Sequence, residues 1–250
     1  MGAQANLTPF PRSVRTYVGR TEERARIRDW LGRETLFLIY GVGGIGKSEF
    51  AYRVMEDLRG LPDWGEADTI LLRVRRAMRP AHVLARLRVA LGVGAGDFRT
   101  SGLGLSSRTN ELDELAETAR VLDARPALVF IDDVHHLEPE QAAHMLGYLS
   151  RHVRNSRILA ASRVEIPLPP DMPLPGVIRL DPLSAADCAT IASQLAEQLG
   201  LEQPDPDWIF RRSGGSPFFV QRLLVAGAGH SGAGEVPGDD VLGELAPGAR

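Results

Sequence analysis

The residues with the clearest chemical meaning are Gly41-Val42-Gly43-Gly44-Ile45-Gly46-Lys47-Ser48. Closely spaced glycines let a backbone curl so that successive N–H groups point at phosphate oxygens. A lysine and a serine at the end of such a loop supply a charge for the β- and γ-phosphates and a hydroxyl for Mg²⁺. The alternative is a glycine-rich turn with a solvated lysine. We predict a nucleoside triphosphate site formed by Gly41, Gly43, Gly44, Ile45, Gly46, Lys47, Ser48 and Glu49.

A pair of acids, Asp132-Asp133, directly follows the apolar run 127–131. Ligands of open α/β sheets bind at the carboxyl ends of the strands, so an acid at this position points toward a bound nucleotide. We expect Asp132 to hold Mg²⁺ together with Ser48, and Asp133 to orient or deprotonate the attacking water. Two acids that merely end a strand or cap the next helix are the alternative. The complete glycine loop earlier in the chain favours the metal site.

Three further side chains lie near these motifs in the sequence. Arg163 follows the apolar run 157–161, and its planar guanidinium could bind a γ-phosphate as a third catalytic group beside Lys47 and Asp133. His135 and His136 could contact nucleotide or a neighbouring protomer. For all three, a solvated side chain is the alternative.

The elements that must position these residues can be read from the apolar pattern. Short apolar runs predict five buried parallel strands, at residues 36–40, 69–74, 127–131, 157–161 and 177–180. Helical spacing predicts helices at 22–31, 47–58, 81–91 and 110–122. Strands that alternate with helices predict an α/β fold: a P-loop NTPase with a five-stranded parallel sheet flanked by helices.

After residue 180 the alternation of apolar strands and helices gives way to a pattern typical of helices alone. Ser184 with Asp187 predicts a capped helix that runs to about Leu199, and Ser216-Pro217 predicts another helix start. We therefore expect an N-terminal arm (1–16), a P-loop nucleotide-binding domain (17–180), a small helical lid domain (181–226) and a flexible tail (227–250). Residues 92–107 are rich in Gly and Ser and predict a flexible loop.

Composition narrows the class of protein. The 250 residues carry a net charge of -3, which gives no overall attraction to nucleic acid or to an anionic membrane. The basic stretch Arg73, Arg75, Arg76 and Arg79 is a local exception, and it is either a solvated face or a contact for nucleic acid or another subunit. Cys188 is the single cysteine, so no intrachain disulfide can form. No apolar run approaches the ~20 residues of a membrane span, and we expect a soluble, cytoplasmic protein.

Over residues 17–224 these motifs together resemble the STAND ATPases, relatives of AAA+ proteins that include the NB-ARC and NACHT modules. Tyr17-Val18-Gly19-Arg20 is similar to the N-terminal VGR signature of that class, and Gly215-Ser216-Pro217 to its GxP motif. The resemblance implies that Val18 and Arg20 line an adenine pocket and that Pro217 packs near the nucleotide from the lid. It also implies that Arg163 is a sensor-1 arginine, and that the cofactors are ATP or ADP with Mg²⁺. No N-K-x-D element is present, which argues against guanine.

The resemblance also bears on function. Members usually carry a winged helix after the lid, and residues 239–250 look like the opening of one. We expect an ATP- and Mg²⁺-binding switch of signal transduction whose nucleotide state controls lid closure and assembly with other copies or with an effector protein. Hydrolysis should be slow, because Asp133 is one carbon shorter than the glutamate common at that position. The alternatives are a nucleic-acid-associated ATPase of the origin-recognition or clamp-loader type, and a scaffold that keeps its nucleotide without hydrolysing it.

Overall fold

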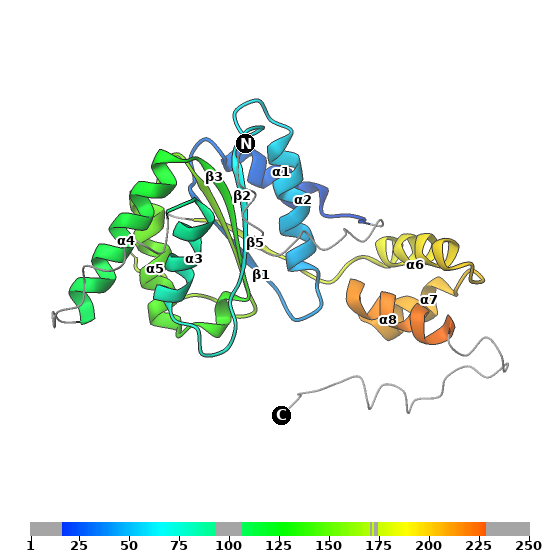
Figure 1. Ribbon diagram of the computed structural model, residues 1–250. Helices are drawn as coiled ribbons and strands as arrows, with labels where there is room; N and C mark the ends of the chain where they lie inside the picture. The colour runs from blue at the N-terminus through cyan, green and yellow to red at the C-terminus, as the bar shows by residue number, and fades with distance from the viewer. Residues whose placement is uncertain (1–16, 94–106, 171, 173–174, 229–250) are drawn as a thin grey trace. The chain divides into compact units, whose positions relative to one another are not determined.

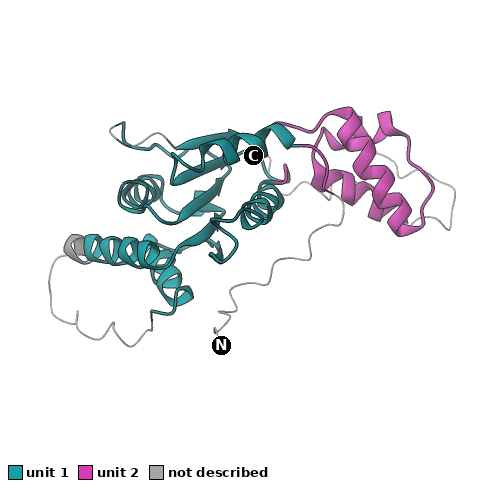
Figure 2. Cartoon of the chain, turned by 90° about the horizontal axis from the view of Figure 1, so that it is seen from above, with its two compact units in different colours: residues 1–13, 20–43, 47–180 teal, residues 14–19, 44–46, 181–250 magenta. Residues whose placement is uncertain are grey.

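The computed structural model describes residues 17–93, 107–170, 172 and 175–228. The predicted N-terminal arm, most of the Gly- and Ser-rich loop and nearly all of the predicted tail lie outside the described residues. The chain divides into two compact units (Figure 2). The first comprises residues 1–13, 20–43 and 47–180, and the second residues 14–19, 44–46 and 181–250.

The first unit is built on a parallel sheet of five strands in the order β2-β3-β4-β1-β5, which confirms the predicted fold class. Central strands are buried on both faces, which explains why their sequences are continuous apolar runs rather than alternating ones. The strands are β1 (Leu36–Tyr40), β2 (Asp68–Arg73), β3 (Ala127–Asp132), β4 (Arg157–Ser162) and β5 (Gly176–Arg179).

Helices cover both faces of this sheet (Figure 1). Helices α1 (Thr21–Trp30) and α2 (Lys47–Arg59) lie on one face, and α3 (Pro80–Ala90), α4 (Ser107–Ala124) and α5 (Pro139–His152) lie on the other. A 3₁₀ turn, η2 (Val134–His136), joins β3 to α5. Within the described ranges, no helix combines the length and the apolar character that crossing a bilayer requires.

Helix α5 was not predicted from the sequence. It begins with Pro139 in the first turn, where a proline costs no hydrogen bond, and the Glu138 carboxylate accepts from the backbone N–H groups of Glu140 and Gln141. Its buried face combines Met145, Leu146 and Leu149 with small residues, and its apolar side is as well defined as that of the predicted α2. Burial of this apolar side in the main core stabilises the helix.

The described part of the second unit contains three helices, α6 (Ala185–Leu199), α7 (Pro206–Ser213) and α8 (Pro217–Ala228). The Ser184 hydroxyl accepts from the backbone N–H of Asp187 at 3.1 Å, so α6 begins as predicted. Helix α7 was not predicted, and its N-cap is Asp205, whose carboxylate accepts from the N–H of Asp207. These helices share a small apolar core of Leu183, Cys188, Ile191, Ala192, Ile209, Val220 and Leu224.

Gly215 is expected to be the most sensitive glycine of the second unit. Its φ is +78°, and a Cβ there would lie 2.7 Å from the Cβ of Pro182 and 2.8 Å from the carbonyl oxygen of Leu183. We expect Gly215→Ala to destabilise the unit by about 2–4 kcal/mol, through backbone strain together with the clash. Gly200→Ala is the matched control, because φ is +67° there but no atom lies within 4 Å of the added methyl. Its cost should be about 1 kcal/mol. Amide hydrogen exchange in α6 and α8 measures both, and equal losses of protection would contradict the expectation.

Candidate functional site

The loop between β1 and α2 carries the predicted phosphate-binding residues. β1 lies at the switch point of the sheet, because β2, β3 and β4 follow on one side of it and the chain then crosses to β5 on its other side. The Nζ of Lys47 donates to the carbonyl oxygens of Gly41 at 2.7 Å and Val42 at 2.9 Å, and the residue is 7% exposed. Burial, and then the nearby charge of Arg163, lower the pKa of Lys47. The two hydrogen bonds from Lys47 therefore stabilise the loop between β1 and α2.

The backbone of the same loop is shaped for an anion. Gly44 and Gly46 have φ values of 78° and 93°, which a side chain would disfavour. Among the described residues, no acceptor takes a hydrogen bond from the N–H groups of Gly43, Gly44 or Gly46. These donors, at the N-terminus of the 13-residue α2, fit phosphate oxygens.

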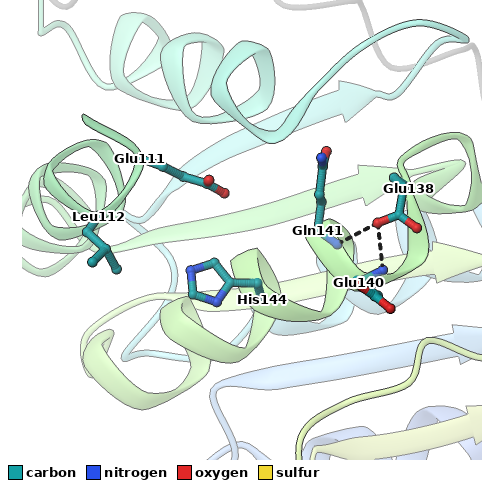
Figure 3. Close-up of a pocket in the computed structure, with 6 residues that line it drawn as sticks. All are labelled: Glu111, Leu112, Glu138, Glu140, Gln141 and His144. Atoms are coloured by element: carbon teal, nitrogen blue, oxygen red, sulfur yellow. Dashed lines mark hydrogen bonds between the residues drawn. The ribbon is translucent and has the colours of Figure 1, made fainter. Parts of the chain in front are cut away.

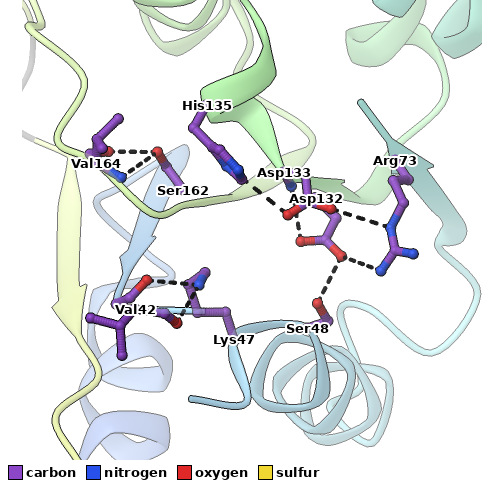
Figure 4. Close-up of polar contacts among 10 residues, drawn as sticks. Val42, Lys47, Ser48, Arg73, Asp132, Asp133, His135, Ser162 and Val164 are labelled. Carbon is purple, nitrogen blue, oxygen red and sulfur yellow. Dashed lines mark hydrogen bonds and ion pairs between the residues drawn. The ribbon is translucent and has the colours of Figure 1, made fainter. Parts of the chain in front are cut away.

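The predicted metal ligands lie together. The Ser48 hydroxyl donates to Oδ2 of Asp132 at 2.7 Å, and Asp132 is 4% exposed at the end of β3 (Figure 4). A hydroxyl and a carboxylate are the hard oxygen ligands that Mg²⁺ accepts, with its other positions left to water and phosphate. The two residues therefore fit Mg²⁺. Elsewhere in the described ranges, no cluster of three His, Cys, Asp or Glu side chains could hold a metal ion.

Asp133, the predicted water-activating residue, has an unusual backbone. Its φ of 57° and ψ of 38° are left-handed. This conformation costs a non-glycine residue free energy and persists where the surrounding structure enforces it. Its backbone N–H donates to Oδ1 of Asp132 at 2.9 Å. Its own carboxylate lies between two side chains, with Oδ2 3.5 Å from Nε of Arg73 and Oδ1 4.0 Å from Nδ1 of His135.

Arg73 was missed as a site residue. The sequence grouped it with a basic stretch, but the register of β2 and β3 pairs Arg73 with Asp132, and its Nη2 donates to Oδ2 of Asp132 at 3.2 Å. The side chain is 61% exposed, so the ion pair contributes little to stability. The available signal was its place at the end of a strand, on the same sheet edge as the acids. Arg73 is thus both largely exposed, as a solvated face implies, and paired with the acids.

Arg163 lies at the phosphate-binding loop. A Cβ added to Gly43 would lie 3.2 Å from Nη1 of Arg163, so the guanidinium rests directly against this part of the loop. Because β4 lies between β1 and β3, the residue after β4 falls between the loop and the acid pair. The structure thus brings Arg163, Lys47, Ser48, Asp132 and Asp133 to one edge of the sheet. Their chemical roles stay predictions.

His135 is also part of this edge, and the solvated interpretation is wrong for it. Its side chain is 12% exposed, and its ring lies 4.4 Å from that of His136, centroid to centroid. Burial, followed by the charge of His136, lowers the pKa of His135, so the imidazole is neutral at pH 7. Figure 4 shows it directed toward Asp133.

The second unit contains its own contacts to loop residues. The Ser216 hydroxyl donates to the carbonyl oxygen of Gly44 at 3.0 Å. A Cβ added to Gly46 would lie 3.6 Å from Cγ of Pro217, so this proline lies beside the loop glycine. Its contact with a nucleotide stays a prediction. Val18 packs against the apolar core of α6–α8.

Two predicted binding residues take part in local ion pairs. Nη1 of Arg20 lies 3.2 Å from Oε1 of Glu23, and Oε1 of Glu49 lies 3.4 Å from Nε of Arg53. Arg20 has a left-handed φ of 61° just before α1. Contact of Arg20 or Glu49 with a nucleotide stays a prediction.

A separate hollow of about 500 Å³ lies between α4 and α5 (Figure 3). Its lining contains none of the motif residues, and its three carboxylates would repel a phosphate. The residues are Glu111, Leu112, Glu138, Glu140, Gln141 and His144. The carboxyl edge of the sheet is therefore the candidate phosphate site.

Comparison with known proteins agrees with this geometry. A model of the AAA domain matches residues 28–168. A STAND protein with a tetratricopeptide repeat sensor from Pyrococcus horikoshii is similar in structure, with a TM-score of 0.62 and 18% identity, over 93% of this chain and 32% of that one. The Aeropyrum pernix ORC1 protein in complex with DNA has a TM-score of 0.62 and 20% identity, over 92% of this chain and 65% of that one.

A third similar structure is the Aeropyrum pernix ORC2 protein in ADPNP–ADP complexes, with a TM-score of 0.57 and 16% identity, over 90% of this chain and 66% of that one. No curated protein matches the chain. The chain spans about a third of the STAND protein's length and about two thirds of each ORC protein. Because the family match covers more than half of the sequence and the phosphate-binding loop lies at the end of β1, the chain belongs to the AAA domain family of P-loop, AAA+-related ATPases.

Proposed function

We propose that this protein is an ATP- and Mg²⁺-binding ATPase that hydrolyses slowly and acts as a signal-transduction switch. The observation that carries the proposal is the contact between Ser48 and Asp132 beside the loop that Lys47 braces. A hydroxyl, a carboxylate, an ammonium group and backbone amides that have no acceptor within the described residues are the groups that a metal-bound triphosphate requires.

Each residue would have a defined task. The loop amides and Lys47 bind the β- and γ-phosphates, and Arg163 offsets the charge that develops on the γ-phosphate. Ser48 and Asp132 would hold Mg²⁺, which would supply positive charge to offset that of the phosphates. Asp133 accepts the proton of the attacking water. Hydrolysis is slow, because the Asp133 carboxylate has a short reach and lies 3.5 Å from Arg73.

The switch role assigns the nucleotide-binding domain to residues 17–180 and the lid domain to residues 181–226. Nucleotide would control the lid through Arg163 and Pro217, and the lid would control assembly with other copies or with an effector protein. Two observations support this assignment. In the second unit, Ser216 and Pro217 already lie against loop glycines, and the STAND protein of P. horikoshii shares the fold.

A nucleic-acid-associated ATPase is the second candidate. It is favoured by the fold shared with the ORC1 protein, whose structure contains DNA. The basic stretch supports it less than the sequence suggested, because Arg73 is engaged with Asp132 and Asp133. Binding to duplex DNA that weakens steeply with salt would favour this candidate over the switch.

Thermal melting with ATP, ADP and GTP in the presence of Mg²⁺ tests the proposal. A ligand at 100 times its dissociation constant stabilises the native state by about 2.7 kcal/mol. ATP and ADP should raise the melting temperature and GTP should not. A stronger effect of GTP would contradict the adenine assignment, and no effect of any nucleotide would exclude the proposed function. A stable ADP complex without turnover would support the scaffold instead.

A further inference from the structure

Asp133 is flanked by two side chains that compete for its carboxylate. Arg73 approaches Oδ2 from the end of β2, and His135 approaches Oδ1 from η2. Figure 4 shows Arg73 and His135 on opposite sides of Asp133, with His135 on the side of Lys47 and Ser162. A carboxylate drawn toward Arg73 stays on the side of Asp132, and one drawn toward His135 moves to the side on which Lys47 lies.

His135 is held in place by its surroundings. It lies on a single 3₁₀ turn between the buried residues Val134 and Leu137, which anchor the turn in the main core. Its Nδ1 atom is shielded from solvent and has no hydrogen-bond partner within the described part of the chain. A buried polar atom without a partner costs about 1–3 kcal/mol, so a partner in another state of the site would recover that cost.

We propose that His135 is a positioning residue for Asp133: its Nδ1–H donates to Oδ1 of Asp133 and turns the carboxylate from Arg73 toward the side of Lys47. The proposal rests on the proposed ATPase function, because it assigns the group that orients the water-activating acid. The hydrogen bond forms when the present 4.0 Å separation shortens by about 1 Å to ordinary donor–acceptor distance. Contacts of catalytic groups often tighten in this way when substrate binds.

The imidazole is chemically suited to this task. A neutral ring carries one N–H, and the neighbouring carboxylate selects the tautomer with that proton on Nδ1. The charged and titratable groups that face the ring are His136, Asp133, Arg163 and Lys47. Two of these are cations and disfavour an imidazolium, so the ring donates one hydrogen bond without adding charge to the site.

Steady-state ATP hydrolysis by the whole chain tests the proposal. We expect His135→Ala to lower kcat about 10- to 100-fold, because a misplacement of about 1 Å at a reacting group can cost that much. KM and ATP affinity should stay within about twofold, because His135 does not bind the nucleotide. His135→Asn should restore much of the rate, since its amide nitrogen occupies the place of Nδ1, whereas His135→Gln should not. His144→Ala removes an exposed histidine of α5 and should change nothing.

A double-mutant cycle separates positioning from a general structural effect. If His135 acts through Asp133, the variant that combines His135→Ala with Asp133→Asn should be no slower than Asp133→Asn alone. Additive losses would overturn the proposal, and so would a His135→Ala variant with the parent's kcat.

The ring tautomer gives a readout that does not depend on turnover. The ¹⁵N shifts of the His135 ring, with bound ADP or a non-hydrolysable ATP analogue, should show the proton on Nδ1, and Asp133→Asn should weaken that preference. A ring protonated on Nε2 in the complex would overturn the positioning role even if the ATPase function holds. Absence of nucleotide binding by the parent chain would instead overturn the proposed function itself.

Discussion

Lys47→Ala is expected to abolish the binding of ATP and ADP, with a loss of affinity of at least about 100-fold, or about 2.7 kcal/mol. The substitution removes the ammonium group that would contact the phosphates and also the two hydrogen bonds from Nζ to the carbonyl oxygens of Gly41 and Val42. The loop therefore loses charge and shape together. Titration calorimetry with ATP and ADP measures the loss directly.

Arg59→Ala is the matched control for this substitution. Arg59 is an exposed cation in the last turn of α2, so the variant removes a positive charge from the same helix but not from the loop. We expect it to bind nucleotide like the parent. Lys47→Ala protein that still binds ATP with the parent's affinity would show that the loop does not hold the phosphates.

Lys47 also allows a chemical test, because it is the only lysine in the sequence. An amine-reactive reagent can modify this side chain and the α-amino group and no other amine. We expect ATP with Mg²⁺ to protect Lys47 and to leave the α-amino group reactive, as read by peptide mass spectrometry. Equal labelling of Lys47 with and without ATP would count against phosphate contact at this lysine.

Asp133→Ala is expected to preserve ATP binding and to lower kcat about 10²- to 10⁴-fold, the usual contribution of a general base. Binding should survive because the ligands of phosphate and metal, Lys47, Ser48 and Asp132, make their own contacts independently of the Asp133 carboxylate. Single-turnover hydrolysis measures the chemical step, and fluorescence of a bound ATP analogue measures affinity.

Three variants make this test specific. Asp133→Asn keeps the shape of the side chain and removes its basicity, so it should be as slow as Asp133→Ala. Asp133→Glu lengthens the side chain by one carbon and should hydrolyse at least as fast as the parent. Glu140→Ala removes an exposed acid of α5 and should have no effect. Hydrolysis by Asp133→Ala at the parent's rate would show that another group activates the water.

The local features of the site could be predicted from the sequence. The phosphate-binding loop is a contiguous segment between an apolar strand and a helix. Residues that are neighbours in this part of the sequence are therefore also neighbours in the site. Ser48 and Asp132 are 84 positions apart and still could be paired, because parallel strands bring their carboxyl ends to the same edge. The types of these residues, a hydroxyl and a carboxylate, then indicated a metal site.

The missed features depend on packing between distant elements. The pairing of Arg73 with Asp132 follows from the register of β2 against β3, and strand register cannot be read from one strand. The burial of His135 arises because η2 packs against β4 and α5, and α5 itself was not predicted. Because no helix was expected after His136, His135 was assigned to a loop, where a solvated histidine is the ordinary expectation.

The position of β4 has a consequence for how this protein can change over evolution. With β4 between them, β1 and β3 are two strand spacings apart, about 10 Å, so the loop and the acids are anchored on separate strands. The gap between them is closed by side chains, with Ser48 reaching Asp132 from α2. A related protein could lose the acids at the end of β3 and keep the phosphate-binding loop after β1 intact. Retention of the ligand and its turnover are thus separately heritable traits in this architecture.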